Sequence, residues 1–364
     1  MNNMVDAGNE ICRVFIDRNY DMFAVLLNEL KKEERYDKFM IVTDSNIYPK
    51  CFDFLKKSMD KYNLNYEVTL IKPGEENKNI IQYEKLINSF SEANMTRKSL
   101  VIAFGGGVCT DISGFAAATY MRGIDYINLP TTLLAQVDAS IGGKTGIDTS
   151  THKNTIGAFK QPLFTYINTE VLKTLPKREM ISGIGEVIKY SAIMDDDGKL
   201  MDYIMENSDR IINSDEEVLF QIIWNCSEFK AGIVKSDECE CGLRKILNFG
   251  HTFGHAIELL AGISHGEAVI YGMKMAFEYS LLKGYIKKEY ADKFYATIRK
   301  FDIEDINIDS SYDEIEKLIK RDKKSSFGKN MFILPCGEYS VGQFEIDLNC
   351  NSDIKQTIEK NIYK

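Results

Sequence analysis

"LVIAFGGGVCTDISGFAAATYM", residues 100–121, decides the fold of this chain. Its uninterrupted apolar run is typical of a buried strand, three glycines follow, and a helical pattern begins soon after them. Glycines let backbone N–H groups approach a phosphate, and a helix N-terminus favours negative charge. We expect Asp111 to cap this helix. The stretch is not G-x-G-x-x-G, so it predicts either a nucleotide-binding turn or a tight strand-to-helix turn without a catalytic role.

Strand-like runs alternate with helical patterns in the first half of the chain. The runs with strand character are 39–44, 66–72, 99–104, 126–130 and 163–168. This alternation predicts a mostly parallel sheet covered by helices, with ligands bound at the carboxyl ends of the strands. From about residue 172 the strand signal fades and helical apolar spacing takes over, with Gly262 and Gly284 at expected helix ends. We therefore predict an α/β, Rossmann-like domain over residues 1–175 and a mostly α-helical domain over 176–364.

Charge and cysteine content restrict the class of protein. The 364 residues carry a formal net charge of −9, and an acidic protein of this kind is not expected to bind nucleic acid. No stretch approaches the roughly 18 apolar residues of a membrane helix, and the first residues lack a signal-peptide pattern. Eight cysteines without framework spacing favour reduced thiols and a cytoplasmic location.

Polar residues follow four of the predicted strands, the glycine turn included. Asp44 ends an early strand in "TDSN", where an acid can accept hydrogen bonds from a ribose diol. "PGEENK" brings Glu75 and Lys78 after the next strand, and "PTTLLAQVDASIGGKTGID" follows another. Each segment alone is typical of a solvated turn. Four such segments, each following a strand, favour a binding crevice that all four segments line together.

Three of the four histidines, His251, His255 and His265, fall within fifteen positions. His251 and His255 are four apart, so on a helix they share a face and can bind one metal ion. His265 lies past Gly262, where we expect a new helix to begin. A catalytic zinc takes three protein ligands, so spacing leaves all three histidines as candidates, with Glu186 in the apolar "GIGEVIKY" as a further one. The alternative is that they are ordinary, partly buried histidines.

Cationic side chains are dense near these motifs. In an acidic protein this predicts a pocket for an anionic small substrate, because Arg binds carboxylate or phosphate through two bonds and Lys acts as a point charge. The cations concerned are Lys144, Lys153, Lys189, Lys230, Arg244 and Lys323.

Six motifs of the chain together resemble the 3-dehydroquinate synthase family, in the family's order, from about residue 40 to 336. They are "GGGVCTDISGFAAATYMRG", "LPTTLLAQVDASIGGKTGID", "KNTIGAF", "SGIGEVIKY", "GLRKILNFGHTFGHAIE" and "HGEAV". The resemblance implies conversion of 3-deoxy-D-arabino-heptulosonate 7-phosphate to 3-dehydroquinate and phosphate, a carbon–oxygen lyase step of the shikimate pathway to aromatic amino acids. It also implies NAD and a divalent metal, zinc or alternatively cobalt, as cofactors, and a homodimer.

The resemblance implies residue roles as well. Glu186, His251 and His265 become the metal ligands, which replaces the choice of His255 made from spacing, and His255 becomes a substrate-facing group that assists proton transfer. The implied NAD contacts are Asp44, Asn46, Glu75, Lys78, Gly106, Gly107, Asp111, Thr131, Thr132, Lys144 and Lys153. The implied substrate contacts are Asp138, Lys144, Asn154, Lys189, Lys230, Arg244, Asn248 and Lys323. Arg122 would reach the phosphate from the neighbouring subunit.

The residue types suit the implied reaction. Zinc would hold the vicinal hydroxyls of the substrate and acidify the one that is oxidised. Hydride transfer to NAD leaves a ketone, the ketone permits elimination of phosphate, the hydride returns, and an internal aldol step closes the ring. The cations would stabilise carboxylate, phosphate and enolate charge. Two segments depart from the family: Cys109-Thr110 replace small or aliphatic residues, and His152, expected in a surface loop, replaces a glycine.

Three other functions compete with this one. A sister sugar-phosphate cyclase, such as 2-deoxy-scyllo-inosose synthase or a valiolone-forming enzyme, would share the metal and NAD motifs, but Arg244, Asn248 and His255 favour a carboxylate-bearing substrate. An iron-dependent alcohol or glycerol dehydrogenase would not need Lys144, Lys189 and Arg244 together. A non-enzymatic NAD- or metal-binding regulator would not need the full set of polar residues.

Overall fold

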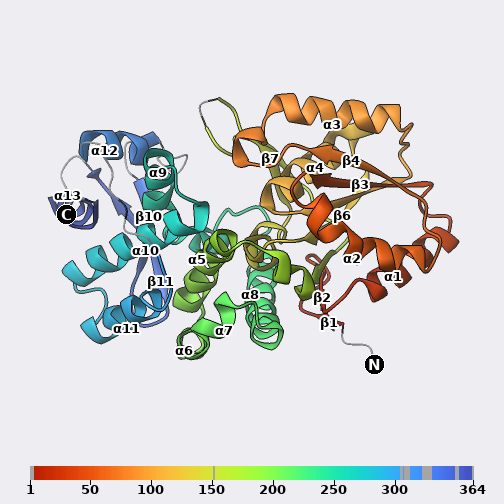
Figure 1. The fold of residues 1–364 in the computed structure, drawn as a ribbon. Coiled ribbons are helices and arrows are strands. Elements are labelled where there is room, and N and C mark those ends of the chain that lie inside the picture. Colours follow the sequence, from red (N-terminus) through yellow and green to blue (C-terminus); the bar gives the residue numbers. More distant parts are fainter. Residues whose placement is uncertain are drawn as a thin grey trace. The chain divides into compact units, whose positions relative to one another are not determined.

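The computed structural model describes residues 4–150, 152–303, 306, 312–321, 330–348 and 352–362. The chain forms two compact units (Figure 1). The first comprises Met1–Pro176 and Leu219–Cys239, and the second comprises Lys177–Val218 and Glu240–Lys364. This division differs from the predicted domains, 1–175 and 176–364, in the placement of Leu219–Cys239.

A seven-stranded sheet forms the centre of the first unit, in the order β1-β2-β9-β6-β5-β3-β4. All neighbouring strands are parallel except β1 and β2. The five predicted strand runs correspond to β3, β4, β5, β6 and β9, so the predicted α/β fold with a mostly parallel sheet is confirmed. The bounds are β1 (Val5–Asp6), β2 (Val14–Asp17), β3 (Lys38–Asp44), β4 (Tyr66–Ile71), β5 (Ser99–Gly105), β6 (Asp125–Pro130) and β9 (Thr165–Asn168).

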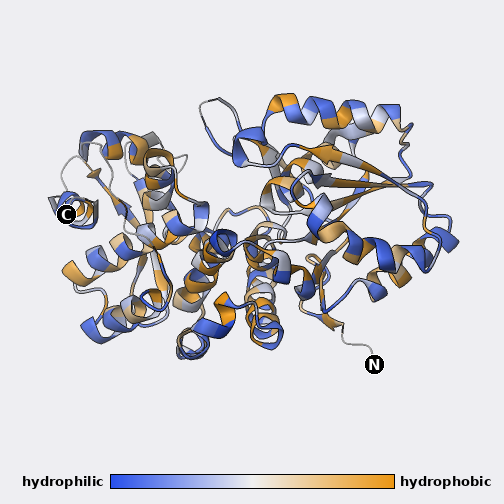
Figure 2. Cartoon of the chain, viewed as in Figure 1, coloured by the Kyte–Doolittle hydropathy of each residue, from blue (hydrophilic) through white to orange (hydrophobic). Residues whose placement is uncertain are grey.

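Helices cover both faces of this sheet. Side chains of a strand alternate between faces, so Ile41 packs into one hydrophobic cluster with α1 and α2, and Val42 into the other with α3 and α4. Figure 2 shows these helices with hydrophobic and hydrophilic residues interspersed, as expected for helices with one side on the core. Their bounds are α1 (Asp21–Lys32), α2 (Tyr48–Asp60), α3 (Ile80–Glu92) and α4 (Gly107–Thr119).

Helix α8 (Glu216–Ser236) begins in the second unit and continues into the first. The side chain of Asn9 donates to the carbonyl of Ala231 at 2.9 Å, and the Lys230 ammonium donates to the carbonyl of Asp138 at 2.7 Å. These contacts explain why Leu219–Cys239 belongs to the first unit. The apolar spacing of α8 predicts a helix but carries no information about the element that the helix packs against.

The second unit is mostly helical, as predicted, and also contains a hairpin of β10 (Asn330–Pro335) and β11 (Val341–Ile346) that the sequence pattern did not indicate. Among the described residues, no helix has the length and apolar content needed to cross a membrane. The helices are α5 (Lys177–Ile193), α6 (Lys199–Glu206), α7 (Ser208–Ile212), α9 (His251–Ala261), α10 (His265–Leu282), α11 (Lys288–Ile298), α12 (Tyr312–Arg321) and α13 (Ser352–Ile362).

Candidate active site

One carboxylate and two imidazoles meet in the second unit. Glu186 lies on α5, and His251 and His265 are the first residues of α9 and α10. Nε2 of His251 lies 3.7 Å from Oε1 of Glu186, and Nε2 of His265 lies 3.6 Å from the same oxygen. One ligand atom from each residue lies within 4.8 Å of the others. Among the described residues this is the only group of three or more His, Cys, Asp or Glu side chains with such spacing.

Glycines allow the three helices to approach closely enough to form this cluster. Helix α10 packs against α5 and α9 (Figure 1). A Cβ at Gly266 would lie 1.7 Å from the carbonyl oxygen of Ser182 on α5, and a Cβ at Gly272 would lie 1.9 Å from that of Gly250 before α9. Any larger residue would force the backbones apart. The close packing therefore depends on glycine at both positions of α10.

Glu186 has the environment of a metal ligand. Its side chain is fully buried, and the described groups nearest to its carboxylate are the two imidazoles and one ammonium. Lys189, one turn later on α5, forms an ion pair with it. A buried carboxylate with so few partners is costly, and a cation bound to it reduces that cost. One carboxylate and two imidazoles form a ligand set used by catalytic zinc, so these residues fit a divalent metal ion.

Each imidazole of the cluster has a second partner on its other nitrogen. Nδ1 of His251 lies 3.0 Å from the carbonyl oxygen of Phe249, and Nδ1 of His265 lies 3.2 Å from Oε2 of Glu258. Burial of His265 works to lower its pKa, but Glu186 and Glu258 outweigh burial and raise the pKa to about 10. A metal ion would therefore have to displace a proton from His265.

His255 lies beside this cluster but is not a member of it. Its ring centroid is 5.4 Å from that of His251 and 6.0 Å from that of His265. The predicted helix starting at His265 is confirmed, and Gly262 ends α9 in the left-handed conformation, as predicted.

Two further predicted substrate residues of the second unit, Arg244 and Asn248, lie on a 3₁₀ helix, η5 (Leu243–Asn248). The Asn248 amide donates to the carboxylate of Glu240. Sequence reasoning did not single out Glu240 or Glu258. The signal for Glu258 was present, because it lies seven residues after His251 and three after His255, and this spacing places all three on one helix face.

In the first unit, three predicted residues converge on the buried ammonium of Lys78, which was predicted as well. It lies 2.8 Å from Glu75, 3.3 Å from Asp111 and 2.8 Å from Oδ1 of Asn154. Asp148, which was not predicted, lies 3.9 Å away. Burial raises the pKa of Asp111 to about 6, although Lys78 works to lower it. Lys153 also works to lower the pKa of Asp148, so a second cation acts on this group of carboxylates.

The glycine turn differs from its prediction in one respect. Helix α4 begins at Gly107 with Gly106 as N-cap residue, so Asp111 lies inside the helix and does not cap it. Gly106 has an extended backbone and no side chain, so the N–H groups of the first turn do not donate to a side chain of the N-cap residue. Such N–H groups at a helix N-terminus can donate to a phosphate. Thr131 donates its N–H to the carbonyl of Gly105 at 2.9 Å, and the side chain of Thr132 lies against Gly106.

Of the remaining cofactor candidates, Asp44 and Asn46 lie at the carboxyl end of β3, and Lys153 lies in a loop over residues 152–155. Asp44 ends β3, and its Oδ1 accepts hydrogen bonds from the N–H groups of Asn46 at 2.8 Å and Ile47 at 2.9 Å. The carboxylate therefore also closes the turn before α2. Asn46 is exposed, and Lys153 is partly buried beside the exposed His152.

The substrate candidates of the first unit occupy different environments. Asp138 lies on a short π-helix, η3 (Ala135–Ala139), and forms an ion pair with Lys230 of α8. Lys144 is exposed at the start of the hairpin formed by β7 (Lys144–Ile147) and β8 (Ile156–Phe159). Arg122 is exposed with a positive φ of 69°. Lys323 lies outside the described residues.

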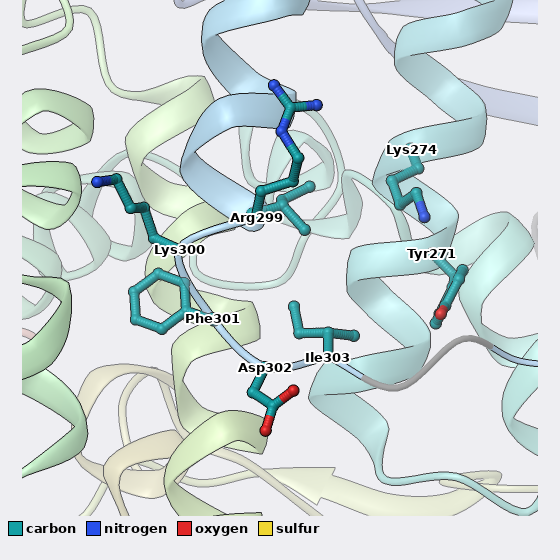
Figure 3. Close-up of a pocket in the computed structure, with 8 residues that line it drawn as sticks. Tyr271, Lys274, Arg299, Lys300, Phe301, Asp302 and Ile303 are labelled. Carbon is teal, nitrogen blue, oxygen red and sulfur yellow. The ribbon is translucent and has the colours of Figure 1, made fainter.

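A separate cavity of about 430 Å³ in the second unit contains none of the predicted residues. In Figure 3 the side chains of Arg299 and Lys300 point away from those of Tyr271 and Lys274, so its cations do not converge. The lining residues are Tyr271, Lys274, Ile298, Arg299, Lys300, Phe301, Asp302 and Ile303.

Comparison with solved structures shows which known proteins share this fold. The chain superposes with a TM-score of 0.86 and 22% identity on 2-epi-5-epi-valiolone synthase from Streptomyces hygroscopicus subsp. jinggangensis 5008, a structure with NAD⁺ and Zn²⁺ bound, over 98% of each chain. A 2-deoxy-scyllo-inosose synthase in complex with carbaglucose-6-phosphate, NAD⁺ and Co²⁺ gives 0.85 and 22%, over 100% of each chain. An iron-containing alcohol dehydrogenase gives a lower TM-score of 0.66, with 13% identity over 98% of this chain and 99% of that one.

Comparison with known sequences shows the family of the chain. The 3-dehydroquinate synthase N-terminal model matches residues 68–182, and the C-terminal model of the same family matches residues 183–325. A 3-dehydroquinate synthase of Thermoanaerobacter sp. (strain X514) is 44% identical over 87% of this chain and 90% of its own length. That of Alkaliphilus metalliredigens (strain QYMF) is 45% identical over 84% and 85%. The chain therefore belongs to the 3-dehydroquinate synthase family.

Proposed function

We propose that this chain converts 3-deoxy-D-arabino-heptulosonate 7-phosphate to 3-dehydroquinate and phosphate, a carbon–oxygen lyase step toward aromatic amino acids. The observation that carries the proposal is the buried Glu186 carboxylate facing two imidazoles, with Lys189 beside it. Sequence identity of 44% to a 3-dehydroquinate synthase over 87% of this chain supports this activity over that of a sister cyclase or a dehydrogenase.

Glu186, His251 and His265 are the proposed ligands of a divalent metal ion, zinc or cobalt. Such an ion, when bound, makes a coordinated hydroxyl more acidic. Glu186 supplies the anionic ligand, and its burial keeps water away from the carboxylate. Lys189 pairs with Glu186 here, and with Glu186 on the metal its ammonium would interact with an anionic substrate.

The first unit is the proposed NAD-binding unit. NAD supplies a reversible hydride acceptor, so the cofactor is unchanged after each turnover. The uncapped turn at Gly106 and Gly107 would hold the pyrophosphate on backbone N–H groups. Asp44, at the end of β3, would accept hydrogen bonds from a ribose. Lys78 would arrange Glu75 and Asp111 for the rest of the cofactor.

The chain's own cations would recognise and stabilise the anionic substrate. Lys189 and Arg244 are buried in the second unit, and Lys230 is buried in the first. A buried cation interacts strongly with the carboxylate, phosphate and enolate charges of this reaction, because little water screens it. His255, close to the metal cluster but outside it, would move a proton on the substrate.

We also propose that the protein works as a cytoplasmic homodimer in which Arg122 reaches the phosphate of the neighbouring subunit's substrate. The exposure of Arg122 supports this role. Light scattering would test the dimer. Mixing Arg122→Ala subunits with subunits inactivated at Lys189 should restore part of the activity only if the arginine acts across subunits.

One assay tests the proposed function. Purified protein receives the heptulosonate phosphate, a divalent metal and NAD⁺ in catalytic amount, and both phosphate and NADH are followed. We expect stoichiometric release of phosphate without net NADH. Net NADH would identify a dehydrogenase instead, and turnover only of a sugar phosphate that lacks a carboxylate would identify a sister cyclase.

A further inference from the structure

We propose that Glu258 is a positioning residue of the metal site, which holds His265 with Nε2 toward the ion and adds a second negative charge beside it. The inference rests on the proposed metal site of Glu186, His251 and His265 and deepens it. Glu258 would not touch the metal itself, because its contact is with the opposite nitrogen of the imidazole.

The turn between α9 and α10 brings Glu258 and His265 together. Gly262 adopts a left-handed conformation with φ of 62° and donates its N–H to the carbonyl of Glu258 at 3.1 Å. The chain then reverses, and His265 starts α10 with Nδ1 at 3.2 Å from Oε2 of Glu258. The Glu258 side chain is only 10% exposed. Glu258 therefore accepts the backbone hydrogen bond of the C-cap residue of α9, and its side chain contacts the first residue of α10.

The two histidines of the cluster are held in the same way. In each, Nδ1 faces an acceptor and Nε2 faces Oε1 of Glu186. An acceptor at Nδ1 keeps the proton there and leaves the Nε2 lone pair for a metal. The acceptors differ, because His251 uses the neutral carbonyl of Phe249 and His265 uses a carboxylate. Glu258 therefore contributes charge as well as orientation.

The charge balance around the cluster agrees with this role. The described acidic groups in contact with the cluster are Glu186 and Glu258, and Lys189 is the cation paired with Glu186. A divalent ion adds two positive charges beside the charge of Lys189, so a second carboxylate offsets more of this positive charge than Glu186 alone. Loss of an outer carboxylate of this type weakens metal binding roughly 10- to 100-fold.

The test measures binding of Zn²⁺ alone to metal-free protein, in competition with a chromophoric chelator. Glu258→Gln keeps the acceptor and removes the charge, and Glu258→Ala removes both. Glu267→Ala is the matched control, because Glu267 also stabilises the start of α10, through a capping box with Ser264, but has no described contact with His265. Absorption of bound Co²⁺ reports the ligand geometry, and thermal unfolding of the metal-free proteins reports folding.

We expect the dissociation constant for Zn²⁺ to rise roughly 10- to 100-fold in Glu258→Ala and about tenfold in Glu258→Gln. The Co²⁺ spectrum should change in the alanine variant and stay close to wild type in the glutamine variant. Glu267→Ala should bind Zn²⁺ within about threefold of wild type.

Wild-type affinity in both Glu258 variants, or equal weakening in Glu267→Ala, would overturn the role of Glu258 and leave the proposed function intact. If Glu258→Ala does not fold, the near-isosteric glutamine variant decides by the same criterion. Failure of the wild-type protein to bind Zn²⁺ would overturn the proposed metal site together with this inference.

Discussion

Two histidines one turn apart on α9 have different surroundings. Nε2 of His251 lies 3.7 Å from Glu186, whereas His255 lies outside the group that could share an ion. Helical spacing treats the two residues as equivalent, because both lie on one face. The position of Glu186 on another helix distinguishes them.

Alanine at these two positions should therefore have different effects. His251→Ala removes a proposed ligand, so we expect loss of stoichiometric zinc in metal analysis and loss of phosphate release. His255→Ala should retain zinc while kcat falls roughly 10²- to 10⁴-fold, the range for loss of an acid–base group. Loss of zinc from the His255 variant would show that the spacing-based choice of ligands was right.

The burial of Asp111 predicts a pH dependence of stability. The pKa of Asp111 is raised to about 6 in the folded chain, so the folded chain binds this proton more tightly than the unfolded chain. Its contribution to the free energy of unfolding is thus present below about pH 4 and is lost as the pH rises through 6. The loss is at most about 3 kcal/mol, at about 1.4 kcal/mol per pKa unit.

Asp111→Asn removes this titration with little change of shape. We expect the urea midpoint of the wild-type protein to fall more steeply between pH 4 and 7 than that of the variant. Other groups titrate in both proteins, so the difference between the two curves is the measured quantity. Parallel curves would contradict the raised pKa of Asp111.

At the scale of elements, the metal cluster depends on the distance between α5 and α10. Gly266 follows the candidate ligand His265, and a Cβ there would meet the backbone of Ser182 at 1.7 Å. A backbone oxygen cannot rotate away as a side chain can, so the helices must separate. Separation would move His265 away from Glu186.

Gly266→Ala should lower the free energy of unfolding by about 1–3 kcal/mol and weaken zinc binding at least about tenfold. Gly232→Ala in α8 is the control, because a Cβ there meets nothing within 4 Å. That variant should gain roughly 0.5–1 kcal/mol from helix propensity. Thermal unfolding and zinc titration measure both effects, and wild-type zinc affinity in Gly266→Ala would show that close packing of α5 and α10 is not required.

At the scale of the whole molecule, the two units carry different parts of the proposed chemistry. The nucleotide candidates are in the first unit, and the metal candidates are in the second. Each ligand should therefore stabilise the unit that binds it, because binding to the folded state alone shifts the unfolding equilibrium.

Removal of metal should abolish phosphate release, and Zn²⁺ or Co²⁺ should restore it. Zinc at 100 times its dissociation constant should add about 2.7 kcal/mol to the free energy of unfolding. Calorimetry of wild type with and without zinc measures this, and His251→Ala should show no such gain. An equal gain in the free energy of unfolding of that variant would show that zinc binds at another site. Full activity after chelation would argue against metal-dependent catalysis.

The sequence by itself determined five strands of the main sheet, the glycine turn after β5 and the family, because these follow from local periodicity and from contiguous motifs. It also supplied Glu186, His251 and His265 as candidates. Periodicity acts over a few residues and assigns a side chain to a face of its own element. Periodicity does not predict which second element packs against that face.

Only the tertiary structure decided which faces meet. Helix α8 continues into the first unit, Asp148 joins Lys78, and Glu258 contacts His265 across a turn. The same holds for the start of α4, where the backbone of Gly106 and not the Asp111 side chain begins the helix. These outcomes depend on close packing between segments distant in sequence and on the conformation of single glycines. The pattern of residue types along one segment predicts neither the packing partner nor the glycine conformation.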